Sequence, residues 1–116
     1  MNARKFFRSF IYAFNGFLIA CKQQNMKFHL ASAVVVLIAA YATGVSTLEW
    51  ALLFIVIGFV LSLEMINTAI EAVVDLASPD IHPLAKVAKD VAAGAVLVFA
   101  VVSVIIGVLI FIPKWI

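Results

Sequence analysis

The chain has 116 residues, of which 66% are hydrophobic and only 12% are charged, and its mean hydropathy is +1.22. A soluble domain carries about twice that share of charged residues and could not bury so much apolar surface, so these values exclude a soluble protein and indicate an integral membrane protein. The net charge of +2 is too small to indicate nucleic-acid binding, and the single cysteine, Cys21, excludes an internal disulfide framework.

The N-terminal segment, residues 1–27, has the pattern of an amphipathic helix. One helical face carries apolar side chains, namely Phe7, Phe10, Ile11, Phe14, Leu18 and Cys21. The other face and its border carry Lys5, Arg8, Tyr12, Asn15 and Lys22. We expect this helix to lie on the membrane surface with its basic side toward lipid phosphates. The same pattern also fits a helix packed within the protein, and the two interpretations are compatible.

Three apolar segments follow, at residues 28–45, 48–76 and 85–112. A helix needs about 20 apolar residues to cross a hydrocarbon core of ~30 Å, so each segment predicts a transmembrane helix. Prolines 79 and 83 limit the loop between the second and third segments, at residues 77–84, because proline ends or begins helices. The predicted fold is therefore an all-α membrane protein of one domain, with a surface helix and three transmembrane helices.

The basic residues predict the orientation of these helices. Seven of the eight precede the first span or lie between the second and third, namely Arg4, Lys5, Arg8, Lys22, Lys27, Lys86 and Lys89. Basic residues near the ends of spans remain in the cytoplasm, so the N-terminus is predicted inside and the C-terminus outside. The loop at residues 77–84 then faces the cytoplasm, where ATP is available.

Four polar residues on one helical face form a polar stripe at the C-terminal end of the second span. Glu64, Asn67, Glu71 and Asp75 follow an i, i+3, i+7, i+11 spacing, which confines them to an arc of roughly 80° on a helix. Carboxylates at the end of a membrane helix are costly, so they indicate a functional site. The alternative is that these groups pair with one another, and with Lys89, to join helices.

The hairpin between the second and third spans brings the stripe close to Lys86, Lys89 and Asp90. Carboxylates, an amide and a lysine at a membrane–water boundary suit the binding of a divalent metal and a polyphosphate. Mg²⁺ is usually held by one or two carboxylates together with phosphate oxygens, and a lysine neutralises phosphate charge. Glu64 is the stripe carboxylate closest to the lipid, where it can take a proton from a lipid hydroxyl.

Two motifs in this region resemble a known family. The runs EMINTAIEAVVDL (64–76) and SPDIHPLAKVAKDVAAGAV (78–96) contain the patterns ExxNxAxExxxD and AKD, and they resemble the prokaryotic diacylglycerol kinase family, which includes undecaprenol kinases. The resemblance implies a homotrimer in the bacterial cell (inner) membrane, with active sites that are shared between neighbouring subunits and lie at the cytoplasmic face. It also implies transfer of the γ-phosphoryl group of ATP to a lipid alcohol.

The resemblance assigns roles to the positions that match the family's motifs. It implies catalytic roles for Glu64, Asn67 and Asp90. It implies nucleotide contacts for Tyr12, Glu71, Asp75, Asp80, His82, Lys89 and Asp90. It implies substrate contacts for Lys5 and Glu64.

The metal site departs from the family's pattern at one position. The resemblance makes Glu71 a ligand of Mg²⁺, which the family usually shares with a glutamate near the start of the first span. Here the segment CKQQNMKFH places Gln23 or Gln24 at that point. A glutamine carbonyl can bind Mg²⁺ but contributes no charge, so we predict weaker metal binding or a larger share carried by Asp75 and the phosphates.

Alternatives remain for the acceptor lipid and for the class of function. The run PDIHPLAKVAKDVAAGAVL is more similar to the undecaprenol kinase branch, which favours undecaprenol over diacylglycerol as acceptor. A small proton-coupled transporter also carries membrane carboxylates, but it needs an acid near mid-bilayer, and these acids gather at one end of a helix. A structural assembly subunit leaves the polar stripe unexplained.

Overall fold

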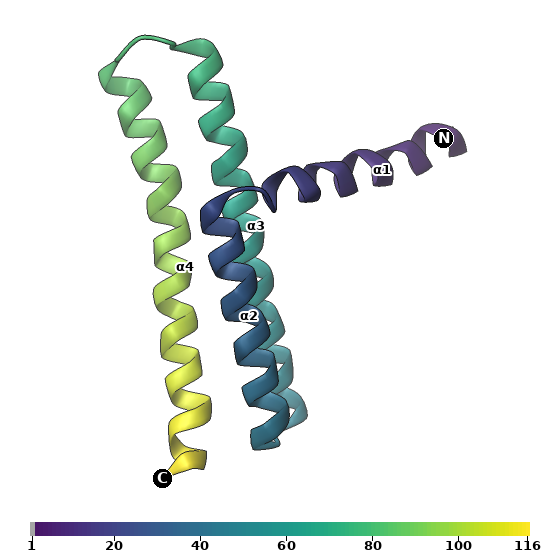
Figure 1. Ribbon diagram of the computed structural model, residues 1–116, viewed down its shortest axis with the longest axis vertical. Helices are drawn as coiled ribbons and strands as arrows, with labels where there is room; N and C mark the ends of the chain where they lie inside the picture. Colours follow the sequence, from purple (N-terminus) through teal and green to yellow (C-terminus); the bar gives the residue numbers. More distant parts are fainter. Residues whose placement is uncertain (1) are drawn as a thin grey trace.

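The computed structural model describes residues 2–116 as four α-helices joined by short connections. They are α1 (Ala3–Ala20), α2 (Gln24–Thr43), α3 (Thr47–Ala77) and α4 (Pro83–Trp115). The last three lie side by side in one bundle, and α1 leads away from it to one side (Figure 1). Each of these three bundle helices is long and apolar enough to cross a membrane. The expectation of an all-α chain with three candidate spans is therefore confirmed.

Local sequence signals explain where the bundle helices begin and end. Gly44 adopts a left-handed conformation with φ of 77°, which terminates α2 at little steric cost. Ser46 and Glu49 form a capping box that starts α3 only a few residues later. The ring of His82 accepts a hydrogen bond from the backbone of Leu84, and Pro83 occupies the first position of α4.

The helices extend further than the apolar segments from which they were predicted. α2 begins at Gln24 rather than residue 28, so part of the segment assigned to the surface helix belongs to the first span. α4 begins two residues earlier and ends three residues later than the predicted 85–112. Hydropathy marks the apolar part of a helix, whereas backbone hydrogen bonding continues into its polar ends.

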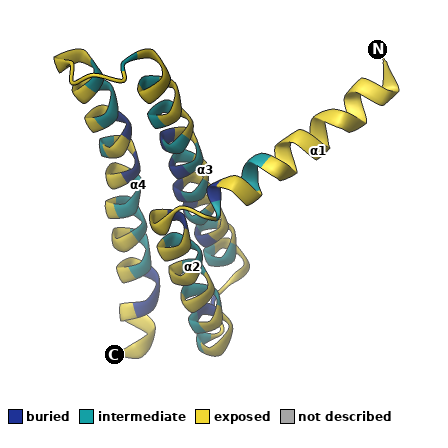
Figure 2. Cartoon of the chain, turned by 45° about the horizontal axis from the view of Figure 1, so that its top comes forward, coloured by how far each residue is buried: buried dark blue, intermediate teal, exposed yellow. Residues whose placement is uncertain are grey.

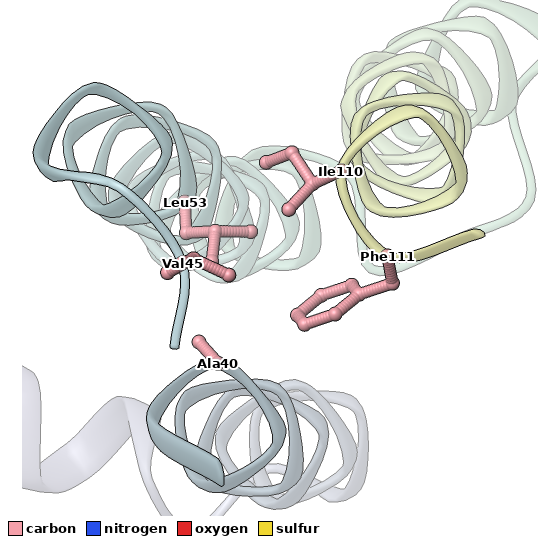
Figure 3. Close-up of a cluster of buried hydrophobic side chains, with 5 residues drawn as sticks. All are labelled: Ala40, Val45, Leu53, Ile110 and Phe111. Carbon is pink, nitrogen blue, oxygen red and sulfur yellow. The ribbon is translucent and has the colours of Figure 1, made fainter. Parts of the chain in front are cut away.

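The hydrophobic core lies at the end of the bundle away from the α3–α4 connection, which we call the closed end. Its buried residues come from the end of α2, the turn after it, the start of α3 and the end of α4 (Figure 3): Ala40, Val45, Leu53, Ile110 and Phe111. The indole Nε1 of Trp115 donates a 3.0 Å hydrogen bond to Thr43, and Nζ of Lys114 lies 3.0 Å from Oε1 of Glu49. Packing and two polar contacts therefore hold all three bundle helices together at this end.

The opposite end, which we call the loop end, is formed by α3 and α4 alone, because both extend past the start of α2 (Figure 1). Nearer the middle of the bundle, Phe59 and Phe99 stack between α3 and α4 with ring centroids 4.7 Å apart. Most of the outer surface of the bundle is exposed (Figure 2), and it includes many large apolar side chains. Such a surface is stable in lipid or against other chains rather than in water.

Candidate functional site

Two polar side chains of α3 are buried deep in the bundle. Glu64 is 3% exposed and Asn67 is 4% exposed, and they are the buried polar residues among those the structure describes. They lie one helical turn apart, as their spacing predicts. Burying a carboxylate costs several kcal/mol unless other polar groups compensate for the lost water, so the neighbours of Glu64 are informative.

The neighbour of Glu64 from another helix is His29 of α2. Its Nε2 lies 3.7 Å from Oε2 of Glu64, and both side chains are largely buried. Sequence reasoning did not single out His29, because nothing on its own helix marks it as functional. The sequence offers one weak signal. His29 is a titratable side chain near the start of an apolar span, at the membrane depth expected for Glu64 on the second span.

Asn67 is hydrogen-bonded to Glu71, the second carboxylate of the stripe. Its Nδ2 donates a 3.1 Å hydrogen bond to Oε1 of Glu71. Its Oδ1 is buried and accepts no hydrogen bond from any residue that the structure describes. A buried acceptor without a partner costs about 1–3 kcal/mol, so this oxygen is a position where a bound donor or cation would be stabilising.

A pocket of about 330 Å³ lies at the loop end, between the last turn of α3, residues 78–82 and the start of α4. Five of the predicted nucleotide-binding residues line it, together with Lys86: Asp75, Asp80, His82, Lys89 and Asp90. They come from three consecutive segments, and the hairpin brings them together. The pocket carries charges of both signs, which suits a ligand with phosphates and a polar base or sugar.

The charged groups of this pocket pair with one another. Nζ of Lys89 donates to Oδ1 of Asp75 at 2.5 Å, and Lys86 donates to Asp90 one turn away. The Lys89–Asp75 contact joins α3 to α4. This agrees with the alternative interpretation, in which Lys89 and the stripe carboxylates pair to hold helices together. Exposed ion pairs contribute only about 0–1 kcal/mol, so a phosphate can replace Asp75 as the partner of Lys89 at small cost.

Two predicted residues of the surface helix, Lys5 and Tyr12, lie apart from this site. Lys5 and Tyr12 are exposed on α1, which leads away from the bundle (Figure 2). Gln23 precedes α2 and Gln24 is its first residue, and both are exposed. A single chain therefore brings together the stripe and the loop-end pocket, but not Lys5 and Tyr12 of α1.

The donor set fits a magnesium ion that is completed by a ligand. Within residues 2–116 there is no group of three or more His, Cys, Asp or Glu side chains that could hold a metal alone. Mg²⁺ seldom uses such a cage, because it is usually bound by one or two carboxylates, water and substrate phosphates. Glu71 and the unpartnered Oδ1 of Asn67 offer oxygens of the required kind.

A family model and several known proteins that are similar to this chain all point to the same family. The model of the prokaryotic diacylglycerol kinase family matches residues 11–111. The undecaprenol kinase of Bacillus subtilis is 51% identical over 111 residues, which cover 95% of this chain and 90% of that protein. The diacylglycerol kinase of Synechocystis is 41% identical over 107 residues, 90% of this chain but 61% of that protein. The diacylglycerol kinase of Pseudomonas aeruginosa is 41% identical over 85 residues, 72% of this chain and 69% of that protein.

Proposed function

The chain belongs to the prokaryotic diacylglycerol kinase family, and we propose that it transfers the γ-phosphoryl group of ATP to undecaprenol. Membership of the family makes it a membrane lipid kinase. The choice of acceptor rests on its 51% identity to an undecaprenol kinase over nearly the whole length of both proteins. Diacylglycerol is the second candidate acceptor, because two of the relatives reported above are diacylglycerol kinases.

The observation that carries this proposal is the arrangement of polar groups along one face of α3. The face starts at the buried Glu64, continues through the linked Asn67 and Glu71, and ends at Asp75 in the loop-end pocket. At ~1.5 Å per residue, this stripe is about 16 Å long. A nucleotide in the pocket can therefore extend its triphosphate along the stripe and point its terminal phosphate at Glu64.

The loop-end pocket is the proposed nucleotide site. Lys89 exchanges Asp75 for a phosphate oxygen, while Asp80 and His82 lie beside the base or sugar. Asp90, which accepts from Lys86, keeps the start of α4 and its lysines in place. Glu71 and Oδ1 of Asn67 would hold Mg²⁺, which neutralises charge on the β- and γ-phosphates when it is bound.

Glu64 is the proposed general base. Its carboxylate takes the proton of the lipid hydroxyl as the hydroxyl oxygen attacks the γ-phosphorus. The bond from that phosphorus to the β,γ-bridging oxygen breaks, and the products are the lipid phosphate, ADP and a protonated Glu64. Phosphoryl transfer depends on positioning and charge stabilisation, which the rigid face of α3 supports.

We propose that the loop end faces the cytoplasm and that α1 lies on the inner membrane surface. Seven of the eight basic residues lie on this side of the bundle, which supports the orientation. α1 leaves the bundle at the start of α2, and the hairpin of α3 and α4 extends beyond that level (Figure 1). Glu64 contacts His29 near the start of α2, which supports a base at the membrane boundary and a nucleotide pocket in water.

We also propose that the working unit is a homotrimer with shared sites. The distance between α1 and the loop-end pocket supports it, since Lys5 and Tyr12 can then serve a neighbouring subunit. The exposed apolar side chains along the bundle provide surface for subunit contacts as well as for lipid.

The direct test is a phosphorylation assay with purified protein in lipid micelles. Protein is incubated with Mg-ATP labelled at the γ-phosphate and with undecaprenol or diacylglycerol in parallel. We expect labelled undecaprenyl phosphate to form faster than labelled phosphatidic acid. Faster labelling of diacylglycerol would reassign the acceptor, and no product from either lipid would reject the proposed function.

A further inference from the structure

An apolar groove of about 360 Å³ lies between α2, α3 and α4. Phe28 and His29 line one end of it and Phe111, a core residue of the closed end, lines the other. The polar side chains in its lining are His29, Ser32 and Ser103, and the Ser103 hydroxyl is already donated to the backbone oxygen of Phe99. The walls therefore suit a hydrocarbon chain, and His29 is the polar group at the end nearest the candidate base.

His29 belongs to both the groove and the buried carboxylate site. It lines the groove from α2, and its Nε2 lies 3.7 Å from Oε2 of Glu64 on α3. Asn67, the buried neighbour of Glu64, donates its amide to Glu71 instead. Among the described residues, His29 is the basic side chain from another helix that lies within 4.0 Å of the Glu64 carboxylate.

We propose that His29 is a positioning residue for Glu64. Its ring holds Oε2, so that Oε1 faces a hydroxyl presented from the inner end of the groove by an alcohol with a long apolar chain. A glutamate side chain has several rotatable bonds, and a contact from a separate rigid helix removes that freedom before the acceptor binds. The 3.7 Å separation is longer than a hydrogen bond, and contacts of this kind commonly shorten when substrate binds. This inference rests on the proposed function.

The groove also indicates how the acceptor approaches. It is closed at the far end, where Trp115 bonds to Thr43 and Phe111 packs into the core. This hydrogen bond brings α4 against α2 there, so another helix, which is about 10–12 Å wide, cannot lie along the whole length of the groove. A single hydrocarbon chain can, with its hydroxyl at the His29 end.

The test compares two substitutions of nearly constant volume. His29→Phe keeps a ring in the groove but removes its nitrogens, whereas His29→Gln keeps a side-chain N–H donor. We expect His29→Phe to lower kcat about ten- to hundredfold, as a misplaced catalytic group does, with the KM for ATP unchanged. His29→Gln should retain more of kcat than His29→Phe. Tyr41→Phe, at an exposed position of α2 that does not line the groove, is the matched control and should stay within about twofold of the unmodified chain.

A double-variant cycle separates positioning of Glu64 from a structural role. Glu64→Asp shortens the side chain by one methylene and so moves the carboxylate away from His29. If the two residues act as a unit, adding His29→Phe to the Glu64→Asp protein should lower kcat little further. Fully multiplicative losses, or a His29→Phe protein with unchanged kcat, would overturn the inference. The proposed function is judged separately, since it fails only if the unmodified chain phosphorylates neither undecaprenol nor diacylglycerol.

Discussion

The amide of Asn67 donates a 3.1 Å hydrogen bond to Glu71 one turn further along α3, and this contact joins these two residues of the polar stripe into one unit. The amide oxygen of Asn67 remains buried and unpartnered among the residues described. The unit therefore presents a carboxylate and a free carbonyl between the buried Glu64 and the loop-end pocket.

Glu64→Gln should abolish turnover and leave the fold intact. General bases contribute about 10²–10⁴-fold to rate, and glutamine cannot accept the hydroxyl proton. Stability should be equal or higher, because the substitution removes a buried negative charge. Lipid phosphorylation and the oligomeric state in detergent provide the measurements. A variant that loses its assembly together with its activity would instead favour a structural role for Glu64.

Asn67→Ala should separate activity from stability. It removes a hydrogen bond worth about 0.5–1.5 kcal/mol but also removes a buried acceptor whose missing partner costs about 1–3 kcal/mol. We therefore expect little loss of stability on unfolding in mixed micelles, and a large fall in kcat with a higher Mg²⁺ requirement. A strongly destabilised protein would show that the amide serves the fold rather than the site.

Gln23→Glu and Gln24→Glu should lower the Mg²⁺ concentration needed for half-maximal rate, at whichever position faces the metal. The added carboxylate contributes a charged oxygen ligand, which the glutamine lacks. Both glutamines are exposed, so the substitutions should not disturb packing. A titration of rate against Mg²⁺ is the measurement. If neither variant changes the Mg²⁺ dependence, this region does not contribute to metal binding.

Lys89→Ala should raise the KM for ATP with little effect on stability. Its pair with Asp75 is partly exposed, and such pairs contribute about 0–1 kcal/mol. The matched control is Lys114→Ala, which removes a lysine from an ion pair of similar kind with Glu49 at the closed end. The control should leave the KM for ATP unchanged. Equal effects of the two variants on that KM would argue against phosphate binding by Lys89.

Trp115→Phe should lower stability without changing kcat. It removes the 3.0 Å hydrogen bond from the indole to Thr43, a contact between α4 and α2, and so costs about 0.5–1.5 kcal/mol. The aromatic ring that remains can still stack beside Phe111. Unfolding in mixed micelles gives the stability, and the phosphorylation assay gives kcat. A fall in kcat with unchanged stability would couple the closed end to catalysis.

Residue patterns on single helices were sufficient for much of the candidate site. The spacing of Glu64, Asn67, Glu71 and Asp75 predicts a common face, since side chains three and four residues apart share one side of a helix. The proline-limited hairpin then predicts that Lys89 and Asp90 lie near Asp75, and all three line the loop-end pocket. These residues lie on one helix or on two helices joined by a short loop, so their proximity could be predicted from the sequence alone.

By itself, the sequence determined the membrane class, the helical spans and the polar face of α3, because a spanning helix satisfies its backbone within its own segment and its periodicity is visible in the residues. Only the tertiary structure decided which side chains meet across helices. It paired His29 with Glu64, Thr43 with Trp115 and Glu49 with Lys114. Such pairs depend on the rotation and depth at which one helix packs against another, and no pattern within either helix specifies them.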